Sequence, residues 1–456
     1  MRTEAWNRLH SCLPEIQSSP WLETMLGRNQ NCAYLKLWGH PTSLEEFRNQ
    51  VPLCDYEQIQ PWVDRIATGE VSLLFPGQPV AFEKTGGSSS GCKLIPYSAE
   101  GLIDFRRALL PWLSNVVTRN RISGSAYFSL SPACRNPEYL AGIPVGLSDV
   151  DYVGKDAGVI FAAVCAVPQS VGKIVDYNEW RKETLHYLKQ AQNLELISAW
   201  SPTFLLQLFE GETTENLLPN LKVISCWADG VSAEYAKALQ QLFPHATIEP
   251  KGLMSTEAVI TIPDEHGHPV LAEAGFFEFI SGNSVLLENE LESEHEYEVV
   301  VTTASGLYRY CTGDIVRYIG RNHAGRAILR FIGRIGLVSD LVGEKLTESF
   351  VATCFRGIAG TWMLVPNVMG DGYTFVADQT IRLPDINMLE TRLMTNPQYA
   401  YARKLRQLKP LAALPVHNLW CYYEQHQAAQ GVRLGDIKPV ALRTERHWVN
   451  LFKSQI

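Results

Sequence analysis

The stretch Thr85-Gly86-Gly87-Ser88-Ser89-Ser90-Gly91-Cys92-Lys93 is the densest run of glycine and hydroxyl side chains in the sequence. Extended segments at residues 80–84 and 93–96 flank it. Because small residues let the backbone fold tightly, N–H groups and hydroxyls in such a loop can converge on an anion. A flexible Gly/Ser linker is the alternative, but linkers rarely join two apolar runs this short. The stretch therefore predicts an anion-binding loop.

Two other motifs compete for this loop. A P-loop would have its lysine where this chain has Cys92. Residues 87–91 fit the nucleophile elbow of a serine hydrolase, with Ser89 as the nucleophile. Both motifs need a helix directly after the loop, whereas residues 93–97 are typical of a strand closed by a proline. We therefore expect a hairpin with the loop between its two strands.

Length and composition indicate an ordinary globular protein. The 456 residues are enough for about two or three domains, with 46% hydrophobic and 19% charged residues. The net charge of −8 argues against nucleic-acid and anionic-membrane partners. The ten cysteines form no CxxC pair, and neither an N-terminal signal-like run nor a membrane-length apolar stretch occurs. We expect a cytoplasmic protein with reduced thiols.

The order of patterns predicts an α/β fold with a smaller second domain. A short apolar strand at residues 221–227, a turn and a helix beginning at Ser232 are typical of a sheet with crossover helices. Residues 246–319 are rich in strands, and a mixture of helical and strand patterns follows from about residue 340. We expect mixed sheets flanked by helices in a domain of residues 1–336. Residues 337–456 would form a small α+β domain.

Two further stretches carry residues suited to a nucleotide. Ser255-Thr256-Glu257 places two hydroxyls beside a carboxylate, which suits magnesium and a triphosphate, although the same pattern is often only a helix cap. The Thr-Gly-Asp turn at Asp314 lies between two extended runs and could accept hydrogen bonds from ribose hydroxyls; a plain hairpin turn is the alternative. Arg334 and Lys345 could supply positive charge for a polyphosphate.

The order of these motifs resembles the adenylate-forming ligase superfamily. More narrowly, residues 306–316, Gly-Leu-Tyr-Arg-Tyr-x-x-Gly-Asp-Ile-Val, are similar to the auxin-responsive (Gretchen Hagen) acyl acid-amido synthetase family and its bacterial relatives. Residues 297–303 and 276–279 are similar to that family too. The resemblance covers about residues 80–350. It implies a large N-terminal domain and a small, mobile C-terminal domain that closes over the site.

The resemblance also implies roles for individual residues. Those that would bind ATP are Thr85, Ser88, Ser89, Lys93, Ser255, Thr256, Asp314 and Arg334, with Glu257 holding Mg²⁺. Lys345 matches a lysine that reaches the α-phosphate, and Lys438 lies where the superfamily often has a mobile catalytic lysine. Aromatic and small residues would line a pocket for an apolar or aryl acid, among them Trp227, Leu253 and Phe128. Each of these three could equally be a plain core residue.

The predicted reaction is ATP-dependent amide synthesis. A small carboxylic acid would be activated as its adenylate, and an amine, expected to be an amino acid, would then displace AMP. No protein nucleophile is needed, which fits a chain with no convincing Ser-His-Asp set. Transfer of the same adenylate to coenzyme A is the nearest alternative. A serine hydrolase at Ser89 and a non-catalytic nucleotide-binding scaffold are the others.

Overall fold

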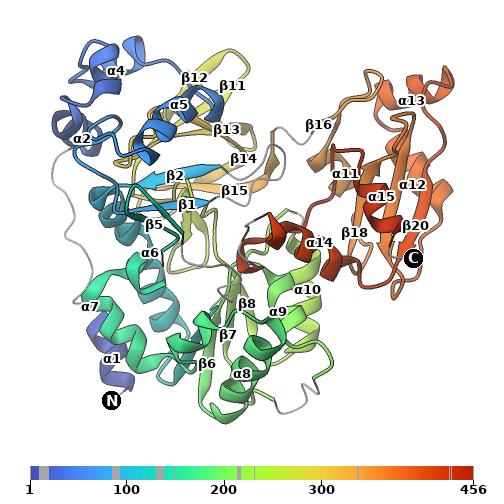
Figure 1. Cartoon of the computed structure of the whole chain (residues 1–456), viewed down its shortest axis with the longest axis horizontal. Coiled ribbons are helices and arrows are strands. Elements are labelled where there is room, and N and C mark those ends of the chain that lie inside the picture. Colours follow the sequence, from blue (N-terminus) through green and yellow to red (C-terminus); the bar gives the residue numbers. More distant parts are fainter. Residues whose placement is uncertain are drawn as a thin grey trace.

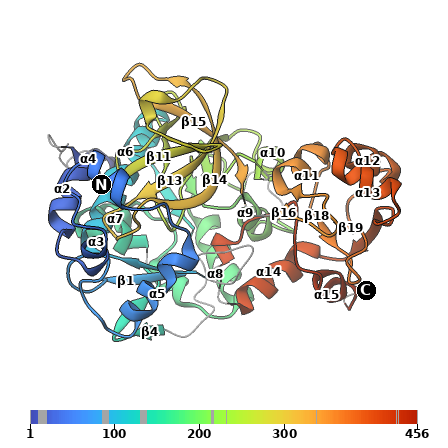
Figure 2. The same cartoon turned by 90° about the horizontal axis from the view of Figure 1, so that it is seen from above.

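The structure is a computed structural model that describes residues 2–9, 20–84, 93–129, 138–147, 149–212, 217–230, 232–335, 338–430, 432 and 434–454. Its elements gather in two lobes (Figure 1). The large lobe holds the elements up to residue 335, and the small lobe, coloured orange to red, holds those from residue 338 onward (Figure 2). The predicted boundary between residues 336 and 337 lies outside the described residues. The predicted α/β class with mixed sheets is confirmed.

The largest sheet has seven strands, and each pair of neighbouring strands in it is antiparallel. In spatial order they are β12 (Ser284–Leu286), β11 (Phe276–Ser281), β13 (Glu296–Thr302), β14 (Tyr310–Arg321), β15 (Ala327–Arg334), β10 (Pro269–Leu271) and β9 (Thr261–Pro263). Along β14 buried residues alternate with partly exposed ones, as expected for a strand with one face on the core. The register sets Asp314 of β14 opposite Arg334 of β15.

A second sheet of the large lobe is fully parallel. Its order is β3 (Ser125–Phe128), β6 (Leu194–Ser198), β7 (Val223–Cys226) and β8 (Thr247–Pro250). The chain between these strands contains α7 (Asp149–Val164), α8 (Tyr177–Gln190), α9 (Pro202–Leu208) and α10 (Ser232–Leu242). Parallel neighbours need such crossover connections, so the crossover helix predicted after residues 221–227 is confirmed.

The predicted hairpin around the glycine-rich loop is also present. Strand β1 (Ala81–Lys84) pairs antiparallel with β2 (Leu94–Tyr97), and β5 (Ile143–Val145) and β4 (Glu138–Leu140) complete a four-stranded sheet. Helix α6 (Ala99–Arg119) begins only after β2. A P-loop or nucleophile elbow would need a helix in the place of β2. The alternative of a serine hydrolase with Ser89 as its nucleophile is therefore not supported.

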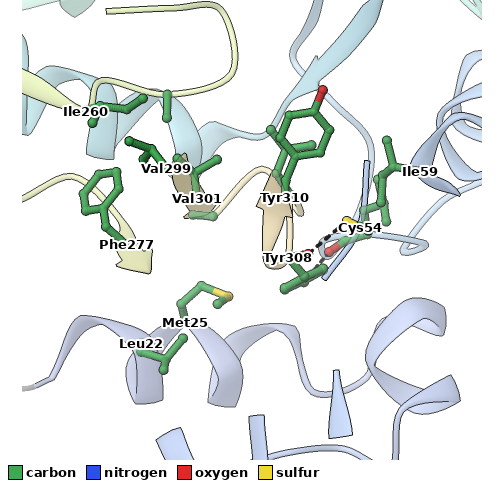
Figure 3. Close-up of a cluster of buried hydrophobic side chains, with 14 of the residues drawn as sticks. Leu22, Met25, Cys54, Ile59, Ile260, Phe277, Val299, Val301, Tyr308 and Tyr310 are labelled. Atoms are coloured by element: carbon green, nitrogen blue, oxygen red, sulfur yellow. Dashed lines mark hydrogen bonds between the residues drawn. The ribbon is translucent and has the colours of Figure 1, made fainter. Parts of the chain in front are cut away.

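Short helices at the N-terminal side cover one face of the seven-stranded sheet. They are α2 (Trp21–Asn29), α3 (Ala33–Leu37), α4 (Leu44–Gln50) and α5 (Tyr56–Ala67), whereas α1 (Arg2–Arg8) packs on α7 (Figure 1). Residues from α2 to α5 share a buried cluster with the sheet, and Figure 3 shows Leu22 and Met25 facing Tyr308 and Phe277 in it. No helix within the described ranges is long and apolar enough to cross a bilayer.

The small lobe has its own sheet and its own core. Strand β19 (Tyr373–Asp378) pairs antiparallel with β18 (Trp362–Pro366) and parallel with β20 (Ala412–Val416). The hairpin of β16 (Val338–Ser339) and β17 (Leu346–Thr347) begins this lobe. Its helices are α11 (Glu348–Cys354), α12 (Ile386–Leu393), α13 (Pro397–Lys404), α14 (Leu419–Ala429) and α15 (Trp448–Lys453).

Helix α14 joins the small lobe to the helices of the large lobe. The rings of Trp420 and Tyr235 of α10 lie 6.4 Å apart. Glu424 is only 4% exposed, and Gln207 of α9 lies beside its carboxyl group. Burial raises the pKa of Glu424 to about 8, against a smaller lowering by Gln207 and Trp420.

This contact predicts that acid pH stabilises the fold. Because the folded-state pKa of Glu424 lies above its unfolded value, its contribution is fully present below about pH 4.5 and is lost as pH rises through about 8. Glu348, with a pKa raised to about 7, acts in the same direction. Thermal unfolding between pH 5 and 9 should therefore show a Glu424→Gln protein losing less stability than wild type. The difference should be on the order of 1–3 kcal/mol.

The matched control for this prediction is Glu179→Gln, which removes an exposed carboxylate at the start of α8. It should follow the wild-type pH profile. Identical profiles for wild type and Glu424→Gln would show that the carboxyl group of Glu424 does not titrate at this contact.

Candidate active site

A cavity of about 120 Å³ lies between the two lobes. Its lining includes five of the residues predicted for the site, namely Trp227, Leu253, Asp314, Arg334 and Lys438. The first four belong to the large lobe and Lys438 to the small lobe. The cavity therefore joins residues that are more than 200 positions apart in the sequence.

Asp314 and Arg334 form a buried ion pair at one wall of this cavity. Arg334 Nε lies 3.0 Å from Asp314 Oδ1, and Asp314 is 4% exposed. Burial raises the pKa of Asp314, and the guanidinium of Arg334 offsets part of that rise. The Asp314 carboxylate in turn raises the pKa of Arg334. A carboxylate with one oxygen on an arginine can still accept hydrogen bonds from a ligand.

The Thr-Gly-Asp residues lie inside strand β14, not in the turn that was predicted, and they aim the carboxylate of Asp314. Gly313 has φ +75°, and a Cβ there would lie 3.0 Å from the carbonyl oxygen of Ile335, so a side chain would be strained. Thr312 Oγ1 donates to the carbonyl of Val299 at 2.8 Å and accepts from the Asp314 N–H at 3.0 Å. Thr312 and Gly313 thus fix the backbone of β14 at this point, and Asp314 is the residue of the three that faces the cavity.

The Tyr-Arg-Tyr segment before the Thr-Gly-Asp residues is structural. The guanidinium of Arg309, which is 6% exposed, lies 2.8 Å from Glu278 and donates to the carbonyls of Arg48 and Val51. Tyr308 donates to a carbonyl of the core and accepts from Asn29. Because a buried ion pair is stable only when its hydrogen bonds are satisfied, these contacts hold the start of β14 in one position.

Lys438 contributes the positive charge of the small lobe. Its Nζ lies 4.6 Å from the centre of the Trp227 ring, a favourable cation–π distance. Its side chain is more than a third exposed because it lines the cavity, yet protein groups surround it. This desolvation, followed by the charge of Arg334, lowers the pKa of Lys438, while Asp314 and Glu257 act to raise it.

Lys93 and Glu257 extend the charged group on the large-lobe side. Lys93 Nζ lies 3.2 Å from the hydroxyl of Tyr310 and faces the ring of Tyr56 at 5.3 Å. Burial lowers the pKa of Lys93, and the charge of Glu257 is the largest effect that opposes this lowering. Glu257 is 8% exposed and also lies within electrostatic reach of Asp314. The two residues therefore belong to the same charge network as the ion pair.

Ser255 and Thr256 form the tight turn that carries Glu257. The Ser255 N–H donates a hydrogen bond to the carbonyl of Ala258 at 2.9 Å. Ser255 Oγ also lies within hydrogen-bond distance of the carbonyl and the N–H of Ala258. The carbonyl of Thr256 accepts from Tyr97 at 2.5 Å. Both side chains are half-buried. The sequence pattern here is a turn and not the helix cap that was its alternative.

The other predicted residues lie elsewhere. Thr85, Ser88 and Ser89 lie outside the described residues. Lys345 is exposed, has φ +47° and is not among the residues that line the cavity. Phe128 is buried, its ring centre lies 4.4 Å from that of Phe161, and it lines a second, smaller cavity.

Glu348 was not predicted, although it lies in the cavity wall. It is 8% exposed and accepts a hydrogen bond from the Ala441 N–H at 2.9 Å. Burial raises the pKa of Glu348 to about 7, with Arg334 among the charges that oppose the rise. The sequence offers one hint of this role, because Glu348 comes three residues after Lys345 in the same polar stretch. Its pattern, however, is only that of the first residue of helix α11.

Solved structures with a similar fold include an amido synthetase and a CoA ligase. The AtGH3.15 acyl acid amido synthetase, solved in complex with 2,4-DB, matches with TM-score 0.82 and 17% identity over 100% of this chain and 96% of its own. A 2-hydroxyisobutyryl-CoA ligase in the postadenylation state matches with TM-score 0.55 and 13% identity over 99% and 98% of the two chains. The chain therefore has the two-domain fold of the GH3 and adenylate-forming ligases.

Sequence comparison agrees with this fold. The indole-3-acetic acid-amido synthetase GH3.8 of Oryza sativa subsp. indica is 23% identical, over 72% of this chain and 67% of its own. The jasmonoyl–L-amino acid synthetase JAR6 of Nicotiana attenuata is 23% identical over 72% and 70%. The GH3 family N-terminal domain matches residues 4–215 and the GH3 family central domain matches residues 268–334. With both domains in order along more than half of its length, the chain belongs to the GH3 family.

Proposed function

We propose that this protein is an ATP-dependent acyl acid-amido synthetase that joins a small carboxylic acid to an amine, taken to be an amino acid. The observation that carries the proposal is the cavity between the lobes, where the Asp314–Arg334 pair faces Lys438. Membership of the GH3 family supports an AMP-forming ligase that works through an acyl-adenylate. ATP, the individual residue roles and the amine are our proposal.

The first half-reaction makes the adenylate. A carboxylate oxygen of the acid attacks the α-phosphorus of ATP, the bond from that phosphorus to the bridging oxygen breaks, and pyrophosphate leaves. Negative charge builds up on the α-phosphate oxygens, so a positioned ammonium group stabilises the transition state. We assign this task to Lys438, with Lys345 kept as a second proposed contact. Asp314 would accept hydrogen bonds from the ribose hydroxyls.

The phosphate end of ATP would lie toward the hairpin of β1 and β2. We propose that Thr85, Ser88 and Ser89 bind its oxygens and that Lys93 adds positive charge. Ser255 and Thr256 would border the phosphates through the turn that presents Glu257. The support is that Lys93, Glu257 and Asp314 interact electrostatically across this side of the cavity.

Mg²⁺ fits this arrangement as a partner of the triphosphate. The ion usually binds proteins through one or two carboxylates and completes its shell with water and substrate phosphates. Glu257 is a buried carboxylate of the right kind. In the part of the chain that the structure describes, no group of three or more His, Cys, Asp or Glu residues could hold a metal on its own. Bound there, the ion would neutralise phosphate charge.

The second half-reaction forms the amide. The amine nitrogen attacks the acyl carbon, the bond from that carbon to the AMP oxygen breaks, and the nitrogen releases a proton. No covalent protein intermediate is required. Glu348 is the carboxylate of the small lobe that lines the cavity, and we propose that it faces the incoming ammonium group.

Partners and location follow from the same proposal. Its partners are the two small molecules, and the net charge of −8 does not favour a nucleic-acid or anionic-membrane partner. A reducing, cytoplasmic compartment is part of the proposal because the ten cysteines are scattered without a CxxC pair.

Product analysis tests the proposal and separates it from its nearest alternative. The protein is incubated with ATP, Mg²⁺, a panel of aryl, indolyl and fatty acids, and either an amino-acid mixture or coenzyme A. We expect AMP, pyrophosphate and an amide in equal amounts, and none of them without the acid. A thioester in place of the amide would make the protein an acyl-CoA ligase. If none of the acids in the panel leads to AMP formation, the proposal is overturned.

A further inference from the structure

A second cavity, of about 60 Å³, lies at the carboxyl ends of the parallel strands. Phe128 and Ser129 end β3, Ser198 ends β6, and Lys251 follows β8. Ligands of open α/β sheets bind at this edge. The remaining lining residues are largely aromatic, from α6, α7 and the turn after β6: Phe105, Leu109, Trp112, Tyr152, Phe161 and Trp200.

A charged lysine lies inside this aromatic cavity. Lys251 is 3% exposed, and its Nζ lies 4.6 Å from the ring of Trp112 and 4.7 Å from the ring of Trp200. The ammonium group also donates to Ser198 Oγ at 2.6 Å. Two indole faces stabilise a cation that burial would otherwise disfavour. An ammonium group has three N–H donors and no acceptor, so this cavity presents a hydrogen-bond donor on a largely apolar wall.

A second donor of the same cavity has no acceptor. The indole Nε1 of Trp112 is buried, and no described residue accepts a hydrogen bond from it. Buried polar groups are nearly always paired in native proteins, so this N–H is available for a hydrogen bond to a bound molecule. An acceptor atom of a ligand would pair with it. The cavity thus combines an ammonium group and an unsatisfied N–H.

The two cavities lie back to back. Trp200 lines the second cavity and Trp227 lines the first, and their rings are 5.9 Å apart. Lys251 is followed directly by Gly252, which lines the first cavity. An acid whose carboxyl group is activated beside Asp314 can therefore direct its other end past Trp227 toward Lys251. At about 60 Å³ the second cavity is less than half the size of the roughly 150 Å³ cavity that holds a benzene, so it fits an end group only.

We propose that the acyl substrate carries a hydrogen-bond acceptor at the end remote from its reacting carboxyl group, and that Lys251 and Trp112 bind this acceptor in the second cavity. The acceptor is an oxygen of a second carboxylate, a carbonyl or a hydroxyl. This inference rests on the proposed function and narrows its substrate class from plain apolar acids to acids with a polar end. Phe128, predicted to contact the substrate, would pack against the segment that enters the cavity.

The test measures acid-dependent pyrophosphate exchange with matched acids of equal length. Straight-chain and para-substituted aryl acids would end in methyl, hydroxyl, acetyl or carboxylate. For the wild type we expect kcat/KM to be about 10- to 100-fold higher for one of the acceptor ends than for methyl, because a hydrogen bond to a charged group is at stake. The end group with the largest preference identifies the acceptor. A preference for methyl throughout would overturn the inference.

Lys251→Met keeps the length of the side chain and removes its charge. It should abolish the preference for an acceptor end, mainly through KM, since the removed contact is equally present in ground and transition states. Trp112→Phe should reduce the preference in part. Lys222→Met is the control, because Lys222 lies outside the cavity in an ion pair with Glu195 at 2.9 Å.

The outcomes separate this inference from the proposed function. Exchange with methyl-ended acids alone, or a preference unchanged in Lys251→Met, overturns the inference and leaves the amido synthetase in place. If no acid of the panel supports exchange, both the inference and the proposed function are overturned. Because the wild-type profile already decides the first point, a poorly folded Lys251→Met protein would not leave the inference without a result.

Discussion

Lys438→Met is expected to lower the rate of adenylate formation by about 100- to 1,000-fold, the usual effect of removing one donor to a developing charge. Lys438 is the lysine that lines the cavity from the small lobe, and its ammonium group lies 4.6 Å from the Trp227 ring. Because the lost contact is made chiefly in the transition state, kcat should fall while KM for ATP changes little. Stopped assays of adenylate and pyrophosphate give both constants.

Lys453→Met is the matched control for Lys438→Met. Lys453 is an exposed lysine at the end of α15 in the same lobe, so its removal should leave kcat unchanged. Thermal unfolding of both variants checks the fold. Wild-type kcat in Lys438→Met would show that the α-phosphate charge is stabilised by other groups, with Lys345 the first to test.

Asp314→Asn has the second large expected effect. Asparagine retains an acceptor for the guanidinium of Arg334, which lies 3.0 Å from the native carboxylate, but it has no negative charge. Both the contact with the ribose hydroxyls and the neutralisation of Arg334 are weakened. We expect kcat/KM for ATP to fall by about 10- to 100-fold, mainly through KM, since charge-assisted hydrogen bonds are the stronger ones. Calorimetric titration with ATP measures the same loss as affinity.

An exposed ion pair between β13 and β14 provides the control. Glu296 of β13 lies 2.6 Å from Arg317 of β14, and both side chains are well exposed. Glu296→Gln should change neither ATP affinity nor stability measurably, because exposed ion pairs contribute about 0–1 kcal/mol. Full ATP affinity in a folded Asp314→Asn protein would remove Asp314 from the nucleotide site.

The large-lobe part of the site could be predicted because local patterns fix it. The backbone at Gly313 has φ +75° and requires a glycine, and the strand patterns on either side hold Asp314 in a sheet, although the predicted turn there is a continuous strand. The proline-closed strand at residues 94–97 decided against a P-loop and a nucleophile elbow. In each case neighbours in sequence are also neighbours in space, so a single segment carries the information.

The residues contributed by packing between distant segments could not be predicted in the same way. No sequence pattern distinguishes Lys251, because its place between Trp112 and Trp200 depends on α6 and β6 meeting β8. Glu348 looks like an ordinary first residue of a helix until the small lobe is set against the large one. Pro111 illustrates the same limit. A proline inside a helix usually bends or ends it, but α6 continues past Pro111 to Arg119 with buried residues on both sides of the proline.

Carboxylate-dependent exchange of labelled pyrophosphate into ATP tests the central claim most directly. It reports reversible adenylate formation alone, without the amine and without knowledge of the final product. The account predicts exchange with at least one acid of a panel of aryl, indolyl and fatty acids with methyl, hydroxyl, acetyl and carboxylate ends, and loss of that exchange in Lys438→Met. Measurable ATP binding without exchange for any acid would contradict it and leave a nucleotide-binding scaffold.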